Sequence, residues 1–488
     1  MLTIHSIIIS ILLIFPVISG VLTVLIKRKA FSNFMLNLYG VLHFLGSMYL
    51  IFSAEADFNK YFSIDGLNKV FLLILSFVFL MVVIYNNGYT KNLTVYSNRK
   101  ACFYSNAVIA FVAAMTGAIL ATDLGTAWVL VEATTLASAY LIYFNKTKSS
   151  IEAAWKYVFM CSIGIALAFV GIILLNVSSE NVNTLNYVEL LRNANTFNTF
   201  WLKLSFVFIL FGFGTKMGLA PVHFWLPDAH SESPSPVSAL LSATLLNSAY
   251  LVILRVFNIL NIANCSTYGR IMLAVMGFLS LFVAAVFIYH IKNYKRMLAY
   301  SSIENMGILA IGTALFNGAH YAVILHLIGH SLAKASFFLT SGNILELFET
   351  KRIKSTKGIM TIDKNTGWLW IDSFIAICAF PTSVLFISEF LMIKNMIASG
   401  YYILCGIFVL LLTVILFGMG KAVLNMVFNK PGEEKMEIIT KNKEKLSLSM
   451  YIPEAVLLAI VFILGVYIPP FLNKIIETAQ TSGILGGF

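Results

Sequence analysis

The sequence predicts an all-α integral membrane protein with about fourteen transmembrane helices, and three observations lead to this fold class. Hydrophobic residues make up 59% of the 488 residues and charged residues only 11%, whereas soluble proteins carry roughly 25% charged residues. The mean hydropathy is +0.86. Apolar runs of about 20 residues, the length that crosses a bilayer, follow one another with short polar gaps. The chain therefore reads as one polytopic bundle rather than as several soluble domains.

Fourteen candidate spans follow one another along the chain. They cover residues 4–26, 33–53, 67–87, 101–121, 123–144, 152–176, 199–220, 236–260, 268–291, 299–317, 319–346, 367–398, 401–429 and 449–473. The first run lacks the small-residue cleavage site of a removable signal peptide, so we expect it to remain as a span.

A weak internal repeat divides the chain. The seventh span is interrupted at Pro221, after Lys216, and the twelfth is interrupted at Pro381, before Glu389. Proline-interrupted helices in both halves are typical of inverted repeats in transporters, although isolated proline kinks are also common in membrane helices. We expect a three-helix segment over residues 1–100, two inverted five-helix repeats (helices 4–8 and 9–13) over 101–265 and 266–430, and an inner loop, last helix and tail over 431–488.

The net charge of +11 follows from the distribution of basic residues between loops. If the N-terminus lies outside, the inner loops hold 22 of the 33 lysines and arginines and the outer loops hold six. This asymmetry is the positive-inside pattern of membrane proteins, and it predicts that both termini lie on the outer side. Nucleic-acid binding is not needed to explain the charge. The longest polar inner segment, Lys430–Ser447, reads as a solvated loop or a docking surface.

The sequence gives no sign of a redox cofactor or metal site. Five cysteines occur singly in or next to the apolar spans, without a CxxC pair or a His/Cys spacing typical of metal ligands: Cys102, Cys161, Cys265, Cys378 and Cys405. No GxGxxG or Walker motif is present. We therefore expect no cofactor and no metal on this chain, so that partner subunits would carry any electrons.

Lys216 is predicted to lie inside an apolar helix that Pro221 stops. Burying an ammonium group in hydrocarbon costs at least about 2.5–3.5 kcal/mol. A polar turn carrying Asp228, His230 and Glu232 is expected after the proline. A buried lysine beside an interrupted helix indicates a path for an ion or substrate. The alternative is a lysine that reaches the interface from a helix end.

Glu132 is predicted to lie near the middle of the bilayer, nine residues after Asp123. An unpaired carboxylate at that depth would take up a proton, and Lys216 is its natural counter-ion. Such a pair titrates as a coupled unit, so separating the two groups would favour proton uptake by Glu132 and proton release by Lys216. A static salt bridge is the alternative.

The eleventh span places His326, His330 and Lys334 at positions i, i+4 and i+8. In a helix these residues share one face and rise about 6 Å per step, which suits a relay of titratable groups bridged by water. A buried histidine is otherwise usually a hydrogen-bonded core residue. No acidic or cysteine ligand accompanies the histidines, which argues against a metal.

Glu389, near the second interruption, is a candidate terminal proton donor. Lys394 and Lys421 could each pair with it or extend to the membrane interface. Glu304 lies close in sequence to the basic cluster Lys292–Arg296, so we expect it to form an ion pair at the membrane interface.

Three stretches carry a family resemblance: LGTAWVLVEATTLASA, PVHFWLPDAHSESPSPVSALLSA and AYSSIENMGI. They resemble the antiporter-like membrane subunits of respiratory complex I, Mrp-type cation/proton antiporters and group 4 membrane-bound hydrogenases. The resemblance runs from about Ala101 to Phe428 and is strongest to the hydrogenase-linked, formate hydrogenlyase-type branch. It implies an input pair, a relay on the eleventh helix and a terminal residue, and these correspond to Glu132 with Lys216, to His326, His330 and Lys334, and to Glu389.

The sequence departs from the broader pattern of this family after the proline turn. Many complex I subunits read SALIHAAT there, whereas this chain reads SALLSATL, so that Ser242 replaces a histidine. Water, Ser242 or Asn247 would have to connect Lys216 to the eleventh helix.

The resemblance implies a proton- or sodium-translocating subunit of a redox-driven complex, in particular a group 4 hydrogenase, in a prokaryotic cell (inner) membrane. The implied partners are other membrane subunits, a peripheral redox arm and the lipid bilayer. An Mrp-type sodium/proton antiporter subunit would use the same residues. A membrane anchor that does not pump would need neither Glu132 nor Lys216. A partner in inorganic-carbon uptake is a more distant alternative.

Overall fold

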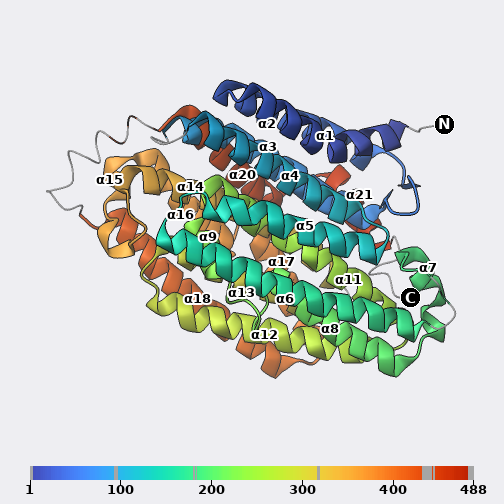
Figure 1. Ribbon diagram of the computed structural model, residues 1–488. Coiled ribbons are helices and arrows are strands. Elements are labelled where there is room, and N and C mark those ends of the chain that lie inside the picture. The colour runs from blue at the N-terminus through green and yellow to red at the C-terminus, as the bar shows by residue number, and fades with distance from the viewer. Residues whose placement is uncertain are drawn as a thin grey trace.

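The computed structural model describes residues 4–92, 97–179, 182, 184–315, 319–430, 442, 444 and 446–481. Within these residues the chain forms a bundle of helices that run side by side (Figure 1). The described chain begins and ends at the same end of this bundle (Figure 1). Most of the predicted loop Lys430–Ser447 lies outside the described residues.

The N-terminal part contains three long helices and a short hairpin between the second and third. Its elements are α1 (Ile4–Ile26), α2 (Lys29–Phe52), β1 (Ala56–Asp57), β2 (Ser63–Ile64) and α3 (Gly66–Asn92). The two strands pair antiparallel.

The next part contains the first interrupted helix. Its elements are α4 (Asn98–Leu120), α5 (Leu124–Tyr143), α6 (Lys148–Ser178), α7 (Tyr187–Asn193), the 3-10 turn η1 (Ala194–Thr196), α8 (Thr199–Met217), α9 (Leu226–Glu232), α10 (Ser235–Leu240), the π-helical turn η2 (Leu241–Leu245) and α11 (Leu246–Ile262).

The remaining part contains the second interrupted helix and the last spans. Its elements are α12 (Ser266–His290), α13 (Tyr294–Ala314), α14 (Ala319–Phe348), the 3-10 turn η3 (Ile353–Ser355), α15 (Ile359–Ile362), α16 (Lys364–Ile377), α17 (Val384–Ala398), α18 (Tyr402–Phe428), α20 (Leu448–Val466) and α21 (Pro470–Thr481).

Polar residues at the loop ends fix where several long helices begin. A capping side chain accepts a hydrogen bond from a free backbone N–H of the first turn, which stabilises the helix start. Ser97, Asp123, Thr147, Asn198 and Asn293 do this for α4, α5, α6, α8 and α13. The apolar runs that follow supply the surfaces that the helices bury or present to lipid.

The all-α membrane fold is confirmed, and twelve helices of the described residues are long and apolar enough to cross a membrane. The tenth and twelfth predicted spans correspond to α13, which carries three charged residues, and to the broken pair α16–α17. The count of fourteen and the inverted repeat stay predictions. The predicted last span, 449–473, is wrong at its end, because α20 stops at Val466 and α21 starts at Pro470.

The two interruptions lie close to their predicted positions, but the first has a different cause. Helix α8 ends at Met217, and Gly218 follows with φ 83°. Glycine adopts this left-handed conformation without steric cost, so Gly218, rather than Pro221, ends the helix. The expected polar turn is instead the short helix α9. The second interruption separates α16 from α17 and contains Pro381.

Helix α14 forms the centre of the bundle. Its apolar window is entirely buried, and it contacts α3, α10, α13, α16, α17 and α20. The neighbouring stretch from α10 through η2 to α11 is buried to the same degree. Titratable side chains on α14 are therefore surrounded by protein rather than by lipid.

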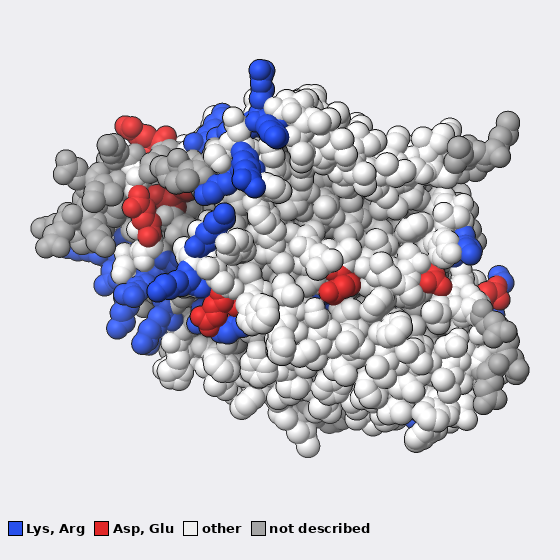
Figure 2. All heavy atoms as spheres, in the orientation of Figure 1, with Lys and Arg blue, Asp and Glu red and all other residues white. Residues whose placement is uncertain are grey.

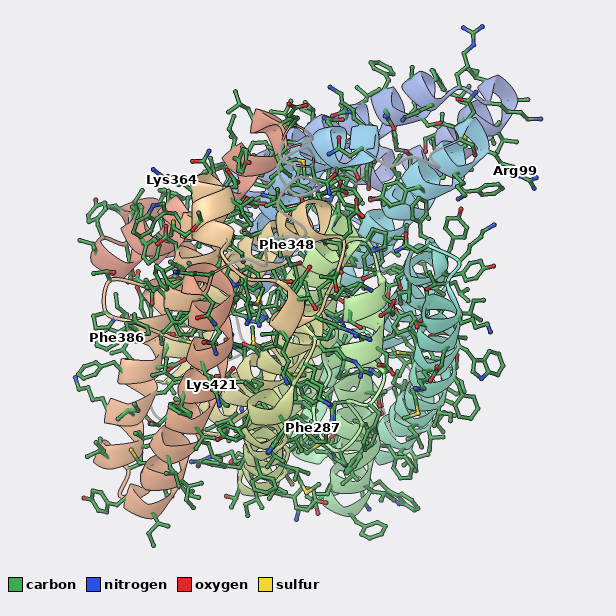
Figure 3. The ribbon with its side chains drawn as sticks, turned by 90° about the vertical axis from the view of Figure 1, so that its left-hand side faces the viewer. Arg99, Phe287, Phe348, Lys364, Phe386 and Lys421 are labelled. Atoms are coloured by element: carbon green, nitrogen blue, oxygen red, sulfur yellow. The ribbon has the colours of Figure 1, made fainter. Side chains whose placement is uncertain are left out.

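Charged side chains concentrate at one end of the bundle. Figure 2 shows most of the blue lysine and arginine spheres at the end opposite to the described chain ends, and few charges on the long surface between them. Arg99 at the start of α4 and Lys364 at the start of α16 are exposed there (Figure 3). This distribution matches the basic loops identified in the sequence.

Candidate functional site

Lys216 is the residue before the last in α8 and is fully buried. It therefore lies at a helix end, not within a helix as the sequence suggested. The C-terminal end of a helix carries partial negative charge, which favours a cation. The Lys216 Nζ donates a hydrogen bond of 3.0 Å to the Tyr157 hydroxyl of α6 and lies 4.9 Å from the centre of that ring. The Tyr157 hydroxyl also hydrogen-bonds Ser138 of α5 at 2.7 Å.

Glu132 on α5 does not touch Lys216 in this structure. Its carboxylate accepts hydrogen bonds from Thr135 at 2.9 Å and from Ser162 at 3.5 Å, and it forms no ion pair within 4.0 Å among the described residues. Lys216 still interacts electrostatically with it. Glu132 is partly exposed on a helix face where Val129 and Leu136 are 55% and 68% exposed. The two predicted partners are thus not in direct contact, and the lysine instead contacts Tyr157.

Aromatic rings extend from the Lys216 site toward α14. Trp225 donates a hydrogen bond of 2.7 Å to the Thr215 carbonyl, and its ring centre lies 4.9 Å from that of Tyr157. The His230 ring on α9 lies 6.0 Å from Trp225 and 5.7 Å from Phe338 of α14. His230 is fully buried and interacts electrostatically with Lys334. It therefore lies between the first interruption and α14.

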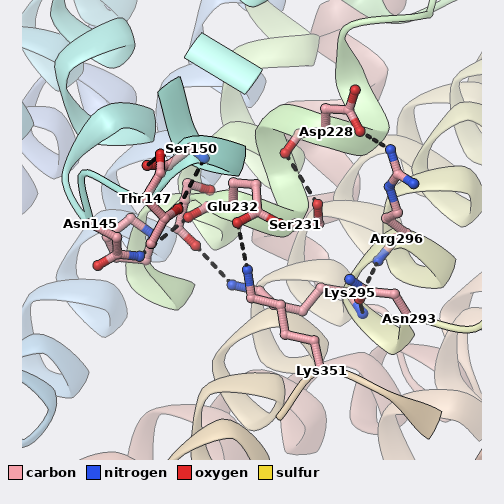
Figure 4. A network of polar contacts seen from close by, with 12 residues as sticks. Asn145, Thr147, Ser150, Asp228, Ser231, Glu232, Asn293, Lys295, Arg296 and Lys351 are labelled. Atoms are coloured by element: carbon pink, nitrogen blue, oxygen red, sulfur yellow. Dashed lines mark hydrogen bonds and ion pairs between the residues drawn. The ribbon is translucent and has the colours of Figure 1, made fainter. Parts of the chain in front are cut away.

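The acidic residues of α9 hold the two halves of the chain together (Figure 4). Asp228 forms ion pairs with Lys156 of α6, at 3.1 Å, and with Arg296 of α13. Glu232 pairs with Lys351 at 2.9 Å. Asp228 therefore forms a cluster of ion pairs, called the clamp below, at the basic end of the bundle. It does not lie among the buried titratable side chains described next.

Lys295 in the same cluster is fully buried, although the sequence placed it in a basic inner loop. Its Nζ donates a hydrogen bond of 2.8 Å to the Ser233 carbonyl between α9 and α10 (Figure 4). The position follows from α13 starting at Tyr294, which turns this side chain toward α9.

Ser242 and Asn247 both reach neighbouring helices of the second half. The Ser242 hydroxyl hydrogen-bonds the Ser302 hydroxyl of α13 at 2.7 Å. Asn247 donates a hydrogen bond of 2.8 Å to Ser331 of α14. Ser242 lies within the π-helical turn η2, a feature that is frequent at functional sites. The replacement of a histidine by Ser242 therefore leaves polar contacts, and not an apolar gap, at this point.

The three α14 residues of the predicted relay, His326, His330 and Lys334, are fully buried. His326 Nδ1 hydrogen-bonds the Ser388 hydroxyl of α17 at 2.9 Å. Lys334 Nζ donates to the Leu298 carbonyl of α13 at 2.9 Å. The His330 ring, whose nitrogens are both buried, interacts with the main chain of Ser242 in η2. His330 thereby connects the π-helical turn η2 to the α14 helix between His326 and Lys334.

Glu304 was expected at the membrane interface, and this expectation is wrong. It lies ten residues into α13, about 15 Å along the helix, is only 5% exposed, and interacts electrostatically with Lys334. It also interacts with Glu389 on α17. Glu304 therefore lies between the α14 lysine and the second interruption.

Glu389 is partly exposed, and no described residue forms a hydrogen bond or ion pair with it. The two lysines considered as its partners point elsewhere. Lys394 is exposed. Lys421, labelled in Figure 3, is also exposed and its Nζ lies 5.5 Å from the centre of the Tyr289 ring. Both lysines fit the alternative of side chains that extend to the surface.

Sequence reasoning missed Tyr157, Lys295 and Glu454. Tyr157 carried no signal, because an uncharged tyrosine in an apolar helix is ordinary. Glu454 did carry one: it is a carboxylate within the apolar run of α20, as Glu132 is within α5. Among the described residues, no group of three or more His, Cys, Asp or Glu side chains could hold a metal ion.

Comparison with known proteins places this arrangement in a family. The sequence profile described as NADH:quinone oxidoreductase/Mrp antiporter, TM, matches residues 121–416. A hydrogenase-4 component F homolog of Methylacidiphilum infernorum is 32% identical, over 97% of this chain and 98% of the relative. Subunit A1 of a Staphylococcus aureus Na(+)/H(+) antiporter is 26% identical over 87% of this chain and 54% of its own length.

The fold has also been seen in a solved structure. A chain of the membrane-bound sulfane sulfur reductase, an archaeal respiratory membrane complex, superposes with a TM-score of 0.86 at 21% identity, covering 98% of this chain and 97% of that one. The resemblance drawn from the three sequence stretches is thereby confirmed. The chain belongs to the NADH:quinone oxidoreductase/Mrp antiporter family of membrane subunits.

Proposed function

We propose that this chain moves protons or sodium ions as the antiporter-like subunit of a redox-driven membrane complex of the group 4 hydrogenase type. The observation that carries the proposal is a line of buried titratable groups between the two interrupted helices. It runs from Lys216 past His230 to Lys334 and on through Glu304 toward Glu389. The full-length similarity to a hydrogenase-4 component F homolog supports the hydrogenase assignment.

The contacts of Lys216 support a role as the input of this line. Its only hydrogen-bond acceptor among the described residues is a neutral phenol, so the charge on the lysine depends on more distant groups. If the Glu132 side chain moves toward Lys216, its negative charge stabilises the ammonium form. When Glu132 moves away, Lys216 releases a proton more readily, and His230 lies on the way to α14.

The exposed position of Glu132 supports a neighbouring subunit as the source of that movement. A partly exposed carboxylate between apolar residues is costly in lipid, and a protein partner would cover it. We extend the proposal to the partners accordingly: other membrane subunits of the complex, and a peripheral redox arm that carries the electrons.

We also propose that the chain lies in a prokaryotic cell (inner) membrane, and the charge distribution supports an orientation with both termini outside. The basic end seen in Figure 2 would then face the cytoplasm, as the positive-inside pattern requires. The clamp at Asp228 would lie at that face.

An Mrp-type sodium/proton antiporter subunit is the second candidate, and the similarity to antiporter subunit A1 favours it. It would exchange the two ions without electron transfer. A membrane anchor that does not pump would predict no functional need for Lys216.

The test is the replacement Lys216→Met in the intact native complex, reconstituted into vesicles. Methionine keeps the volume of the side chain but removes its charge, so ion translocation should fall to background while the complex still assembles. Lys394→Met, which removes an exposed lysine, is the control and should translocate like the wild type. Translocation by Lys216→Met at the wild-type rate would show that the lysine is structural and contradict the proposal. Exchange of sodium for protons without an electron donor would favour the antiporter.

A further inference from the structure

Two cavities adjoin at the end of the bundle where the described chain begins and ends (Figure 1). One is a polar cavity of about 610 Å³, lined by Lys69 at the start of α3 and by Lys474 of α21. The other is an apolar groove of about 300 Å³ between α3, α14, α20 and α21. Phe471 lines both, so they lie next to each other. Neither takes part in the line of titratable groups.

The polar cavity holds positive charge that the described residues do not neutralise. Lys69 is only 8% exposed, and its Nζ donates a hydrogen bond of 2.6 Å to the Ser53 carbonyl. Neither Lys69 nor Lys474 forms an ion pair within 4.0 Å among the described residues. Glu55, which is exposed, is the single acidic residue among the described residues that line the cavity. A buried ammonium group without a counter-ion is costly, so the cavity favours an anion.

The position of these two lysines is unusual for this chain. Most lysines and arginines gather at the opposite end of the bundle (Figure 2), and the sequence assigns only six to the outer loops. Two of these six, Lys69 and Lys474, line one cavity although they lie far apart in the sequence. The positive-inside pattern does not explain them, because it places basic residues at the other end. A local binding partner with negative charge does.

The groove reaches from the end of the bundle into the membrane. Tyr321, near the start of α14, donates a hydrogen bond of 2.8 Å to Asn473 of α21, so α14 begins at this end. Leu332 lines the groove and lies 13 residues after Ala319, about 20 Å along the helix. The groove therefore spans about the depth of one leaflet, roughly 15 Å. Every described residue that lines it is apolar, and water does not fill such a space, because it needs polar partners.

The spacing of residues on α3 joins the lysines to the groove. Lys69, Leu73 and Phe77 follow one another at intervals of four and so lie on one face of the helix. Lys69 lines the polar cavity, and the other two line the groove about 6 Å and 12 Å further along. On α21, Phe471 and Lys474 are likewise neighbours, three residues apart. The composite site therefore fits a molecule with an anionic head and an apolar chain.

We propose that this site binds one anionic phospholipid, with its phosphate group at Lys69 and Lys474 and one acyl chain in the groove. Lysine binds phosphate as a point charge, and the second cation comes from a helix that lies across the mouth of the groove. The inference goes beyond the proposed function and does not depend on which ion the chain moves.

The acyl chain would pack against the back of the relay helix. Ile328 and Leu332 of α14 line the groove. Ile328 is two residues from His326 and from His330, and a spacing of two places side chains on nearly opposite sides of a helix. An empty groove there would deprive these side chains of dispersion contacts, which the acyl chain restores. The lipid would thus support α14 from the side opposite to its histidines.

The first test removes the charge that recognises the lipid head. The intact complex is freed of lipid in detergent and titrated with phosphatidylglycerol, and bound lipid is counted by native mass spectrometry. Lys69→Gln combined with Lys474→Gln should weaken the binding of one lipid about thirtyfold, or about fivefold for each lysine. Phosphatidylcholine, whose own ammonium group balances its phosphate, should bind the wild type more weakly. The control is Lys203→Gln, another lysine assigned to the outer side, whose Nζ lies 5.9 Å from the centre of the Tyr268 ring.

The second test fills the groove and leaves the charges in place. Ile463→Trp adds bulk to a residue of α20 that lines the groove, so the same lipid should bind about tenfold more weakly or less, as methylene groups lose their place. Ile452→Trp is the matched control, because Ile452 lies on the same helix and is 50% exposed, against 55% for Ile463, but does not line the groove. It should bind the lipid like the wild type.

Three results would overturn the inference. Lipid binding that neither test changes would show that the site is not used. A loss with the lysine variants but not with Ile463→Trp would show that a phosphate group binds without its chain. A loss with Ile463→Trp alone would show an uncharged occupant, such as a quinone or a partner helix. If the double lysine variant does not assemble, Lys474→Gln is measured instead, because that side chain is exposed. A fivefold weaker binding then supports the inference, and wild-type binding contradicts it.

Discussion

The two interrupted helices differ in how they hold their charged residue. At the first, Lys216 and the four residues after it are buried, and a tyrosine hydroxyl binds the charge. At the second, every residue from Ala379 to Thr382 is at least partly exposed, and Glu389 has no hydrogen-bond or ion-pair partner among the described residues. The charged residue of the first interruption is thus enclosed by its own chain, although Pro221 and Phe224 further along are exposed, whereas the charged residue and the turn of the second interruption are both open to the surface.

This difference indicates different roles for the two sites. An enclosed lysine changes its charge only through groups that the protein moves or protonates, which suits a controlled input. A partly exposed carboxyl can exchange its proton with water or with a neighbouring subunit, which suits an exit. Helix α14 contacts the second site through His326 and Ser388 and lies next to His230 beside the first. If the two sites work together, helix α14 must connect them.

The largest expected effect comes from breaking this link at Lys334. Lys334→Met removes the charge that interacts with Glu304 and leaves that buried carboxyl protonated. We expect ion translocation by the reconstituted complex to fall on the order of a hundredfold, as for the loss of an essential proton carrier. Lys421→Met, an exposed lysine on α18, should leave translocation unchanged. Equal translocation by both variants would mean that α14 does not connect the two sites.

A smaller effect should follow from loosening the enclosed site. Tyr157→Phe removes the acceptor of the Lys216 hydrogen bond and leaves a buried charged donor unpaired, which costs about 1–3 kcal/mol. Because about 1.4 kcal/mol corresponds to a tenfold change in rate, translocation should fall roughly tenfold. Tyr250→Phe is a matched control, since the Tyr250 hydroxyl is also buried and hydrogen-bonds a threonine, Thr313, at 2.6 Å. An effect of the control as large as that of Tyr157→Phe would point to general destabilisation.

The open site should be sensitive to packing at Gly465. A Cβ at this position of α20 would overlap the backbone of Thr382 and Ser383, between α16 and α17. Gly465→Val should therefore destabilise the complex by about 1–3 kcal/mol, the usual cost of overpacking. Thermal unfolding in detergent measures the change. Gly406→Val, where the added Cβ has nothing within 4 Å, should unfold like the wild type.

The smallest effect is expected at the contact between α14 and the open site. Ser388→Ala removes the hydroxyl that hydrogen-bonds His326, a contribution of about 1 kcal/mol. Translocation should fall roughly fivefold, with assembly unchanged. A wild-type rate in this variant would show that His326 does not depend on α17.

The sequence predicted the helical membrane fold, both interruptions and the α14 residues, because long apolar runs, prolines and buried charges are local signals. It could not place the partners of these charges. Tyr157 lies 59 residues before Lys216 and is uncharged, so only the packing of α6 on α8 reveals their contact. The end of α8 depended on the left-handed conformation of Gly218, which composition does not indicate.

Glu304 shows the opposite kind of error. Its closeness in sequence to Lys292–Arg296 suggested an interface, whereas the helix carries it about three turns away to the Lys334 side chain. Depth along a helix was a better guide than nearness to a charged loop. The same reasoning places Glu454, six residues into α20, in the interior, and it is fully buried.

The central claim is that the two interrupted helices work as one relay, and a double-mutant cycle tests it most directly. Ion translocation is measured in the reconstituted complex for wild type, Tyr157→Phe, Ser388→Ala and the double variant. If the two sites act independently, the two losses, each converted to a free energy, should add within about 0.3–0.5 kcal/mol. A single relay predicts instead that the double variant loses little more than Tyr157→Phe alone. Losses that add fully would contradict the account.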